Sequence, residues 1–196
     1  MPIDELKHKK CTPIVVIGVH FFNRKNHLLE QGILHMLGEI YKVFFIGHRR
    51  VDDFYFVEKQ LDNIVGELIR TKEYVEFYVG KNGDFDTMVA SAIKRAQKRF
   101  GKENNSLILV LPYTVADMEY LEDFYDEIWI PNELHGVHFK NAITKRNEWG
   151  VDHADLLISY VLRDKGGAAN CIRYAEKKGI SIKNLQNKIV LSEEST

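Results

Sequence analysis

Short apolar runs, several of them unbroken, recur along this chain between stretches with helical spacing. The runs cover residues 14–19, 43–46, 75–79, 107–111, 128–130, 156–158 and, more weakly, 180–182 or 189–191. An unbroken apolar run is typical of a strand that is covered on both faces, as in a parallel sheet between two layers of helices. We therefore predict an α/β protein with a doubly wound, mostly parallel sheet and helices on both of its faces.

Two of the intervening stretches have clear helical periodicity. Apolar residues recur at three- and four-residue steps over residues 54–68 and again over residues 85–96. The second stretch starts with Asp84 and Asp86, and we expect one of them to cap this helix. Basic residues toward its end complement the helix dipole, so we interpret them structurally rather than as a nucleic-acid patch. They are Lys94, Arg95, Lys98, Arg99 and Lys102.

Length and charge restrict the function further. The 196 residues fit one domain, and the formal net charge of −1 disfavours a protein that coats nucleic acid or a membrane surface. We therefore expect no nucleic-acid partner and no membrane partner. No apolar run approaches the roughly 20 residues of a membrane helix, and the charged segment 1–10 lacks the apolar centre of a signal peptide. Two distant cysteines, Cys11 and Cys171, give no disulfide framework, so we expect a cytoplasmic protein.

Glycine-containing motifs follow three of the apolar runs. They are Gly47-His48-Arg49, the loop from Gly80 through Gly83 to Asp86, and Gly166-Gly167. Doubly wound proteins bind ligands at the carboxyl ends of their strands, and glycine there lets backbone N–H groups approach a phosphate beside a helix N-terminus. Neither the GxGxxG nor the GxxxxGK[ST] pattern is present. We expect the three junctions to hold a nucleotide-like ligand.

The polar residues of the first two motifs allow more than one role. Arg49 could clamp a phosphate through its planar fork, and His48 could donate to a sugar or a phosphate. Alternatively, Arg49 belongs to a solvated turn and pairs with Asp52 or Asp53. A carboxylate in the second motif competes with a bound anion, so Asp84 or Asp86 could instead accept a hydrogen bond from a ribose hydroxyl. The second motif could also be a plain capped turn, and the Gly166-Gly167 pair could simply mark a turn.

A dense polar segment at residues 146–155 precedes the run at 156–158. Arg146 could hold an anion there, and Asp152 or Asp155 could accept hydrogen bonds from a ribose. The alternative is a polar helix end with Trp149 packed in the core.

The histidines and the second cysteine have simple explanations. The spacing of His135, His138 and His153 matches no zinc signature, so we expect no metal site. Cys171 lies on an expected helix beside core positions, which favours a buried thiol over a nucleophile. We expect no resident cofactor.

Taken in order, these motifs resemble the SLOG superfamily, specifically its YpsA-like branch. The matching segments are Gly47-His48-Arg49, Gly83-Asp84-Phe85-Asp86, Leu111-Pro112-Tyr113, residues 146–155, and Gly166-Gly167 with Tyr174-Ala175. The resemblance covers residues 42–182 and implies a Rossmann-like fold with a nucleotide-derived ligand similar to ADP-ribose or NAD. Distant relatives are DNA-processing protein A and the Lonely Guy phosphoribohydrolases, which cleave the base from a nucleoside monophosphate. On this basis we expect one domain over residues 1–196, with a SLOG-like core at 42–191 and an added N-terminal strand and helix at 12–41.

The chain departs from these family patterns at its glycine loops. Gly166-Gly167 is followed by Ala168-Ala169-Asn170, without the further glycine, the threonine and the nearby glutamate of the Lonely Guy signature. Lys81-Asn82 replaces small residues of the first glycine loop, and Gly150 stands where the YpsA-like branch usually has Met. These departures weaken the case for catalysis more than the case for the fold.

We therefore predict a nucleotide-binding protein of unassigned reaction. One alternative is a hydrolase or transferase acting at an N-glycosidic bond, and another is a non-catalytic interaction module with a decayed pocket. Related folds often pair through helices, and by that analogy the sequence allows a homo-oligomer. The candidate catalytic carboxylates are Asp86, Asp152 and Asp155. The expected ligand-binding residues are Gly47, His48, Arg49, Gly80, Gly83, Asp84, Asp86, Arg146, Asn147, Asp152, Gly166 and Gly167.

Overall fold

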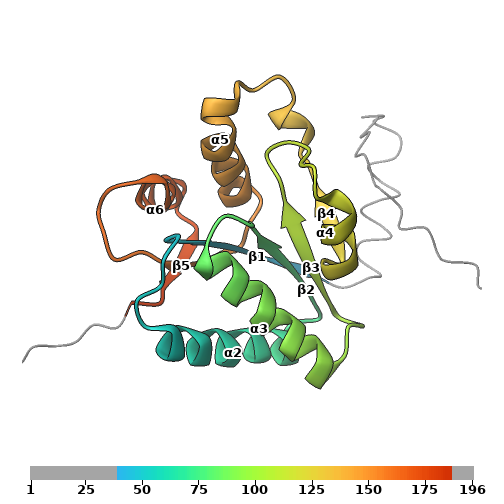
Figure 1. Ribbon diagram of the computed structural model, residues 1–196. Helices are drawn as coiled ribbons and strands as arrows, with labels where there is room; N and C mark the ends of the chain where they lie inside the picture. Colours follow the sequence, from blue (N-terminus) through green and yellow to red (C-terminus); the bar gives the residue numbers. More distant parts are fainter. Residues whose placement is uncertain (1–38, 187–196) are drawn as a thin grey trace, which may run out of the picture.

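The computed structural model describes residues 39–186, in which strands and helices alternate (Figure 1). The strands are β1 (Ile40–Gly47), β2 (Tyr74–Val79), β3 (Asn105–Val110), β4 (Glu127–Trp129), β5 (Leu156–Tyr160) and β6 (Ser181–Asn184). The α-helices are α2 (Phe54–Thr71), α3 (Asp84–Phe100), α4 (Met118–Phe124), α5 (Phe139–Asp152) and α6 (Gly167–Lys178), with a short 3₁₀ helix at Asn132–Leu134. None of the helices within residues 39–186 has both the length and the apolar character needed to cross a membrane.

The six strands form one parallel sheet in the order β4-β3-β2-β1-β5-β6. The chain adds strands outward from β1 to β4 and then returns to place β5 on the other side of β1. In this register Val43 lies opposite Phe77 of β2, and Gly47 lies opposite Tyr160 of β5. The predicted doubly wound, Rossmann-like sheet is confirmed, and its winding reverses between β1 and β5.

Two helical layers cover the sheet, with α2 and α3 on one face and α5 and α6 on the other (Figure 1). Side chains alternate between the two faces along each strand. Phe45 packs with the core under α2 and α3, whereas its neighbour Phe44 packs with the core under α5 and α6. Both rings are fully buried. This double coverage explains why the strands read as unbroken apolar runs.

The strand predictions within the described residues are confirmed. The helix α6 ends at a glycine, Gly179. Gly179 has a left-handed φ of 73°, and its N–H donates to carbonyls of the last helical turn. The helix α4 was not expected. The predicted runs at 14–19 and 189–191 and nearly all of the added strand and helix expected at 12–41 lie outside the described residues. Ile40, expected to belong to that added segment, instead opens β1.

At Gly150, α5 packs tightly against the sheet. A β-carbon at this position would lie only 2.6 Å from the ring of Phe44 on β1. The bulky ring therefore occupies the volume that a larger side chain at position 150 would need.

Candidate functional site

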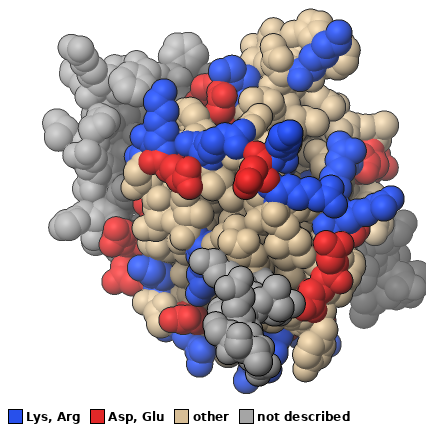
Figure 2. Space-filling model, turned by 90° about the vertical axis from the view of Figure 1, so that its left-hand side faces the viewer, with Lys and Arg blue, Asp and Glu red and all other residues tan. Residues whose placement is uncertain are grey.

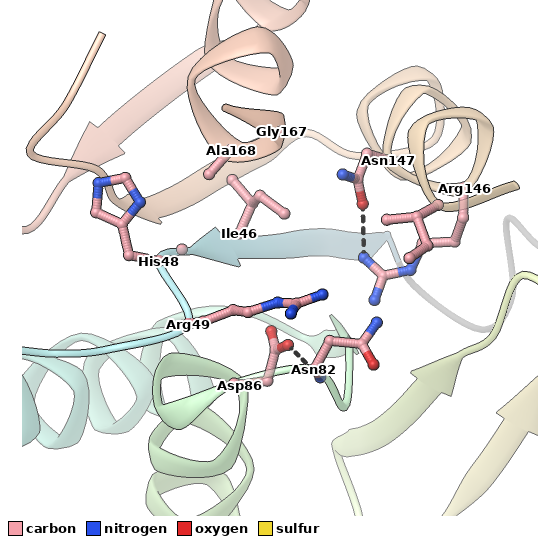
Figure 3. Close-up of a pocket in the computed structure, with 12 residues that line it drawn as sticks. Ile46, His48, Arg49, Asn82, Asp86, Arg146, Asn147, Gly167 and Ala168 are labelled. Atoms are coloured by element: carbon pink, nitrogen blue, oxygen red, sulfur yellow. Dashed lines mark hydrogen bonds between the residues drawn. The ribbon is translucent and has the colours of Figure 1, made fainter. Parts of the chain in front are cut away.

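A cleft opens at the carboxyl ends of β1, β2 and β5, where the winding of the sheet reverses. The backbone N–H of His48 donates to the carbonyl of Tyr160 at 3.0 Å, which joins the ends of β1 and β5. Open α/β sheets bind ligands at such a point. The cleft has a volume of about 330 Å³, which lies in the roughly 300–1,000 Å³ range of small-molecule sites. Its lining residues are Ile46, Gly47, His48, Arg49, Asn82, Gly83, Asp86, Ile143, Arg146, Asn147, Gly167 and Ala168 (Figure 3).

Arg146 of α5 contributes a buried positive charge to this cleft. The side chain is 4% exposed; its Nε donates to the carbonyl of Val110 at 3.1 Å and its Nη1 to Oδ1 of Asn147 at 2.9 Å. Burial lowers the pKa of the guanidinium, but an arginine stays protonated at physiological pH. Nη2 has no hydrogen-bond partner among residues 39–186. The cleft therefore offers a fixed cation with an unused donor.

Asp86 brings a negative charge to the same space. Its Oδ2 accepts the backbone N–H of Asn82 at 2.8 Å. Burial raises the pKa of the Asp86 carboxyl, and the nearby guanidinium of Arg146 partly offsets this effect. Asp86 is the one acidic residue among those that line the cleft, so an incoming anion meets two arginines and one carboxyl group.

The expectation that Asp84 or Asp86 caps α3 is wrong. The N-cap is Gly83, and no side chain bonds to the first helical N–H groups there. Oδ2 of Asp84 instead accepts the N–H of Val51 at 3.4 Å, while the backbone N–H of Asp84 donates to the carbonyl of Arg49 at 2.9 Å. This contact holds the start of α3 directly beside the end of β1. A β-carbon at Gly83 would lie 2.6 Å from Cα of Arg49, so this close contact requires glycine at position 83.

The N-terminus of α6 opens into the cleft without a side-chain cap. Its N-cap, Gly166, has a φ of 104°, and the residues that follow it, Gly167 and Ala168, line the cleft. The first N–H groups of a helix have no partner within the helix and carry partial positive charge. A β-carbon at Gly167 would meet no atom within 4 Å, so this end of the helix is open. It is suited to an anion.

Arg49 is exposed and forms no ion pair with another residue of the described chain, which leaves the alternative of a turn paired with Asp52 or Asp53 without support. Asp53 serves another purpose, because its Oδ1 accepts the N–H of Phe56 and caps α2. In Figure 3 the side chain of Arg49 extends across the cleft on the side of Asn82 and Asp86. Arg49 is thus a second arginine available to a ligand.

His48 points away from the other cleft residues (Figure 3) and forms hydrogen bonds with the loop after β5. Its Nε2 accepts the backbone N–H of Leu162 at 2.9 Å and that of Arg163 at 3.3 Å. Burial and the nearby Arg163 lower the pKa of the imidazole. Nε2 is therefore an acceptor for the backbone, which leaves Nδ1 as the atom that could donate to a sugar or a phosphate.

Two of the candidate carboxylates lie at the opposite edge of the sheet. Oδ2 of Asp155 accepts the N–H of Lys42 at 2.8 Å, where β1 and β5 begin. Asp152, at the end of α5, accepts from the hydroxyl of Tyr174 and pairs with Lys178 at 2.6 Å. Neither residue lines the cleft, so the geometry gives no support to their contact with a ribose there. Gly80, Asp84 and Gly166 adjoin the cleft without lining it.

The remaining candidate groups have structural partners. Residues 39–186 contain no group of three or more side chains that could hold a metal ion. His138 accepts the N–H of Lys140 at the start of α5, and the ring of His153 stacks on Trp149. Trp149 itself packs against the core. Cys171 is 4% exposed and burial raises the pKa of its thiol to about 12, which confirms the buried-thiol prediction.

No protein-family model matches this sequence, and a comparison with curated proteins gave no match. Among solved structures, DNA processing protein A from Streptococcus pneumoniae is similar over 77% of this chain and 52% of its own, with a TM-score of 0.57 and 15% identity. DNA processing protein A from Helicobacter pylori is similar over 76% and 67%, with a TM-score of 0.54 and 15% identity. The chain thus spans about half the length of the first of these proteins. The similarity supports a Rossmann-like fold.

One expectation about partners is overturned by this comparison. The net charge led us to exclude nucleic acid, yet the H. pylori protein, which has a similar fold, is described by its single-stranded DNA binding mode. The exclusion was wrong because a net charge is summed over the whole chain, whereas binding depends on where the charges lie. Figure 2 shows Lys and Arg side chains gathered across the face that carries α6, with acidic residues between them.

Proposed function

We propose that this chain binds a nucleotide or a nucleotide derivative, of the ADP-ribose or NAD kind expected for the YpsA-like branch, with a phosphate group in the cleft. The observation that carries the proposal is the convergence on one space of Arg49, of the unused Nη2 of Arg146, and of the uncapped N-terminus of α6. Planar guanidinium groups and helix N-terminal N–H groups are both preferred phosphate ligands.

Asp86 supports a nucleoside phosphate over a simple inorganic anion. A carboxylate repels a phosphate, so a site for inorganic phosphate alone gains nothing from one. A ribose, in contrast, has hydroxyl groups that donate to a carboxylate. The presence of Asp86 and Arg146 in one cleft therefore suits a ligand that presents a phosphate and a hydroxylated sugar together.

The cleft favours binding over glycosidic-bond chemistry. Hydrolysis at an anomeric carbon commonly uses two carboxylates on either side of the bond. Asp86 is the only one of the three candidates to reach the cleft, since Asp152 and Asp155 lie at the other edge of the sheet. The open volume also counts against a decayed pocket, which side chains would fill.

Single-stranded nucleic acid is a second candidate ligand. Two observations favour it: the DNA binding mode reported for the H. pylori protein of similar fold, and a second arginine-lined cleft that adjoins the first. A strand would place one nucleotide in the cleft and extend its backbone along the neighbouring arginines.

Calorimetric titration with AMP tests the proposal. Arg49 is exposed, so Arg49→Gln should fold normally and should lose about 1.5–3 kcal/mol of binding free energy, the usual value of a charge-assisted hydrogen bond. Lys98→Gln is the matched control, because it removes one exposed positive charge from the far end of α3. Equal loss in both variants, or no AMP binding by the parent at millimolar concentration, would refute the proposal.

A further inference from the structure

A second cleft adjoins the first and shares two of its walls. It has a volume of about 450 Å³ and is lined by His48, Arg49, Arg50, Asp52, Leu162 and Arg163. His48 and Arg49 also line the first cleft. The two spaces are therefore neighbouring parts of one depression at the carboxyl edge of the sheet, divided by the residues that follow β1.

The second cleft is strongly basic. Three of its six lining residues are arginines and one is an aspartate. Arg49, Arg50 and Arg163 are exposed, and no ion pair involves any of them within residues 39–186. Because these exposed arginines have no ion-pair partner among the described residues, their positive charge favours an anionic occupant. The planar fork of each guanidinium matches a phosphate or a carboxylate.

Hydrogen bonds to β5 and its following loop hold the walls of this cleft in place. Nε2 of His48 accepts two backbone N–H groups of the loop that carries Arg163. The N–H of Asp52, on the facing wall, donates to the hydroxyl of Tyr160 at 3.3 Å. The loop is tied further by Asn184, whose Oδ1 accepts the N–H of Val161 at 3.1 Å. The arginines thus project from backbone segments that are fixed on both sides.

We infer that the second cleft is a subsite for a second phosphate group of the ligand, which makes a nucleotide with at least two phosphates the preferred substrate class. The inference rests on the proposed function, since Arg49 then contacts both phosphates from the shared wall. Two sources supply such a pair of phosphates: the diphosphate of a free nucleotide, and consecutive nucleotides of a strand. Arg163 and Arg50 contact the second phosphate. Neither of them lines the first cleft.

Calorimetric titrations with AMP, ADP and the dinucleotide pApA, at constant physiological ionic strength, test this inference. ADP or pApA should bind the parent at least tenfold more tightly than AMP does. Arg163→Gln and Arg50→Gln should remove this preference and leave AMP affinity within twofold of the parent value. Lys98→Gln, which also removes one positive charge, should keep the preference. Preference for ADP identifies a free nucleotide as the source, and preference for pApA identifies a strand.

Two results would overturn the subsite. One is equal affinity of AMP, ADP and pApA for the parent, in a protein that does bind AMP. The other is an equal loss of AMP and ADP affinity in Arg163→Gln, which would mean that this arginine serves the first cleft. Absence of AMP binding to the parent would instead refute the proposed function itself, so the two failures are distinguishable.

Discussion

Nη2 of Arg146 occupies the space that a β-carbon at Gly80 would take. A glycine at the end of β2 thereby lets a guanidinium from α5 reach across the sheet edge. The other two nitrogens of that guanidinium are held by Val110 and Asn147, so the group has little freedom to withdraw. The position of the buried charge thus depends on a residue with no side chain.

Substituting Gly80 with alanine should therefore displace Arg146. We expect Gly80→Ala to lose about 1–3 kcal/mol of unfolding free energy, the usual cost of an added buried methyl group, together with most of the AMP affinity. Urea denaturation and calorimetry measure the two effects. Gly167→Ala is the control for stability, because a β-carbon there meets nothing within 4 Å. Unchanged AMP binding in a stable Gly80→Ala protein would show that Arg146 does not contact the ligand.

Asp86→Asn should change the discrimination between inorganic phosphate and AMP. The amide retains an oxygen to accept the N–H of Asn82 but removes the negative charge that opposes an anion. Inorganic phosphate should therefore bind the variant at least fivefold more tightly, an effect of about 1 kcal/mol. AMP should gain less, because its ribose loses a carboxylate acceptor. Competition titrations monitored by calorimetry give both constants, and an unaltered phosphate affinity would place the anion away from Asp86.

The order of the glycine motifs was enough to predict that these glycines would gather at one edge of the sheet. Apolar runs buried on both faces identify parallel strands, and glycines that follow them must gather at one edge of the sheet. Gly47, Gly83 and Gly167 accordingly line one cleft. The second cleft was not predicted. Arg50 and Arg163 line the same cleft only because β5 pairs with β1, and this pairing joins residues over a hundred positions apart.

Residues 146–155 show what the sequence left undetermined. Their density of polar groups predicts one functional segment, but α5 runs between the two edges of the sheet and is about 21 Å long for its 14 residues. Arg146 therefore faces the cleft, whereas Asp152 and Asp155 lie where β5 begins. The capping error at α3 has a similar origin, since an aspartate near a helix start can bond to another segment, as Asp84 does to Val51.

The hydrogen bonds that His48 accepts from the loop after β5 should make the free energy of unfolding depend on pH. Its Nε2 must be unprotonated to accept the N–H groups of Leu162 and Arg163, and burial followed by Arg163 lowers its pKa, with Asp52 opposing. The unfolded chain, with a histidine pKa of about 6.5, then binds protons before the folded protein does. The contribution of His48 to the free energy of unfolding is complete above the pKa of the unfolded state and is lost as the pH falls below it.

Urea denaturation at pH 7.5 and pH 5.5 measures this dependence. The parent should lose more unfolding free energy between the two values than His48→Gln, whose amide oxygen accepts hydrogen bonds but does not titrate in this range. The other seven histidines are common to both proteins and cancel in the comparison. Identical pH dependence of the two proteins would show that His48 is not held unprotonated.

Cys171 should resist alkylation in the native protein. It is 4% exposed, and burial raises the pKa of its thiol to about 12, so little thiolate forms at neutral pH. Peptide mass spectrometry after iodoacetamide treatment should find Cys171 unmodified in buffer and modified in denaturant. Rapid native labelling would contradict the packing of α6 against the sheet.

We propose that a nucleotide phosphate lies at the uncapped start of α6, between Arg49 and Arg146. The most direct test is an amide ¹H–¹⁵N correlation spectrum of the isotopically labelled protein during titration with AMP. We predict saturable shifts concentrated on the backbone amides of Gly83, Gly167 and Ala168, with the amides at the amino ends of β1 and β5 unmoved. Shifts confined to other parts of the molecule, or none at millimolar AMP, would contradict the claim.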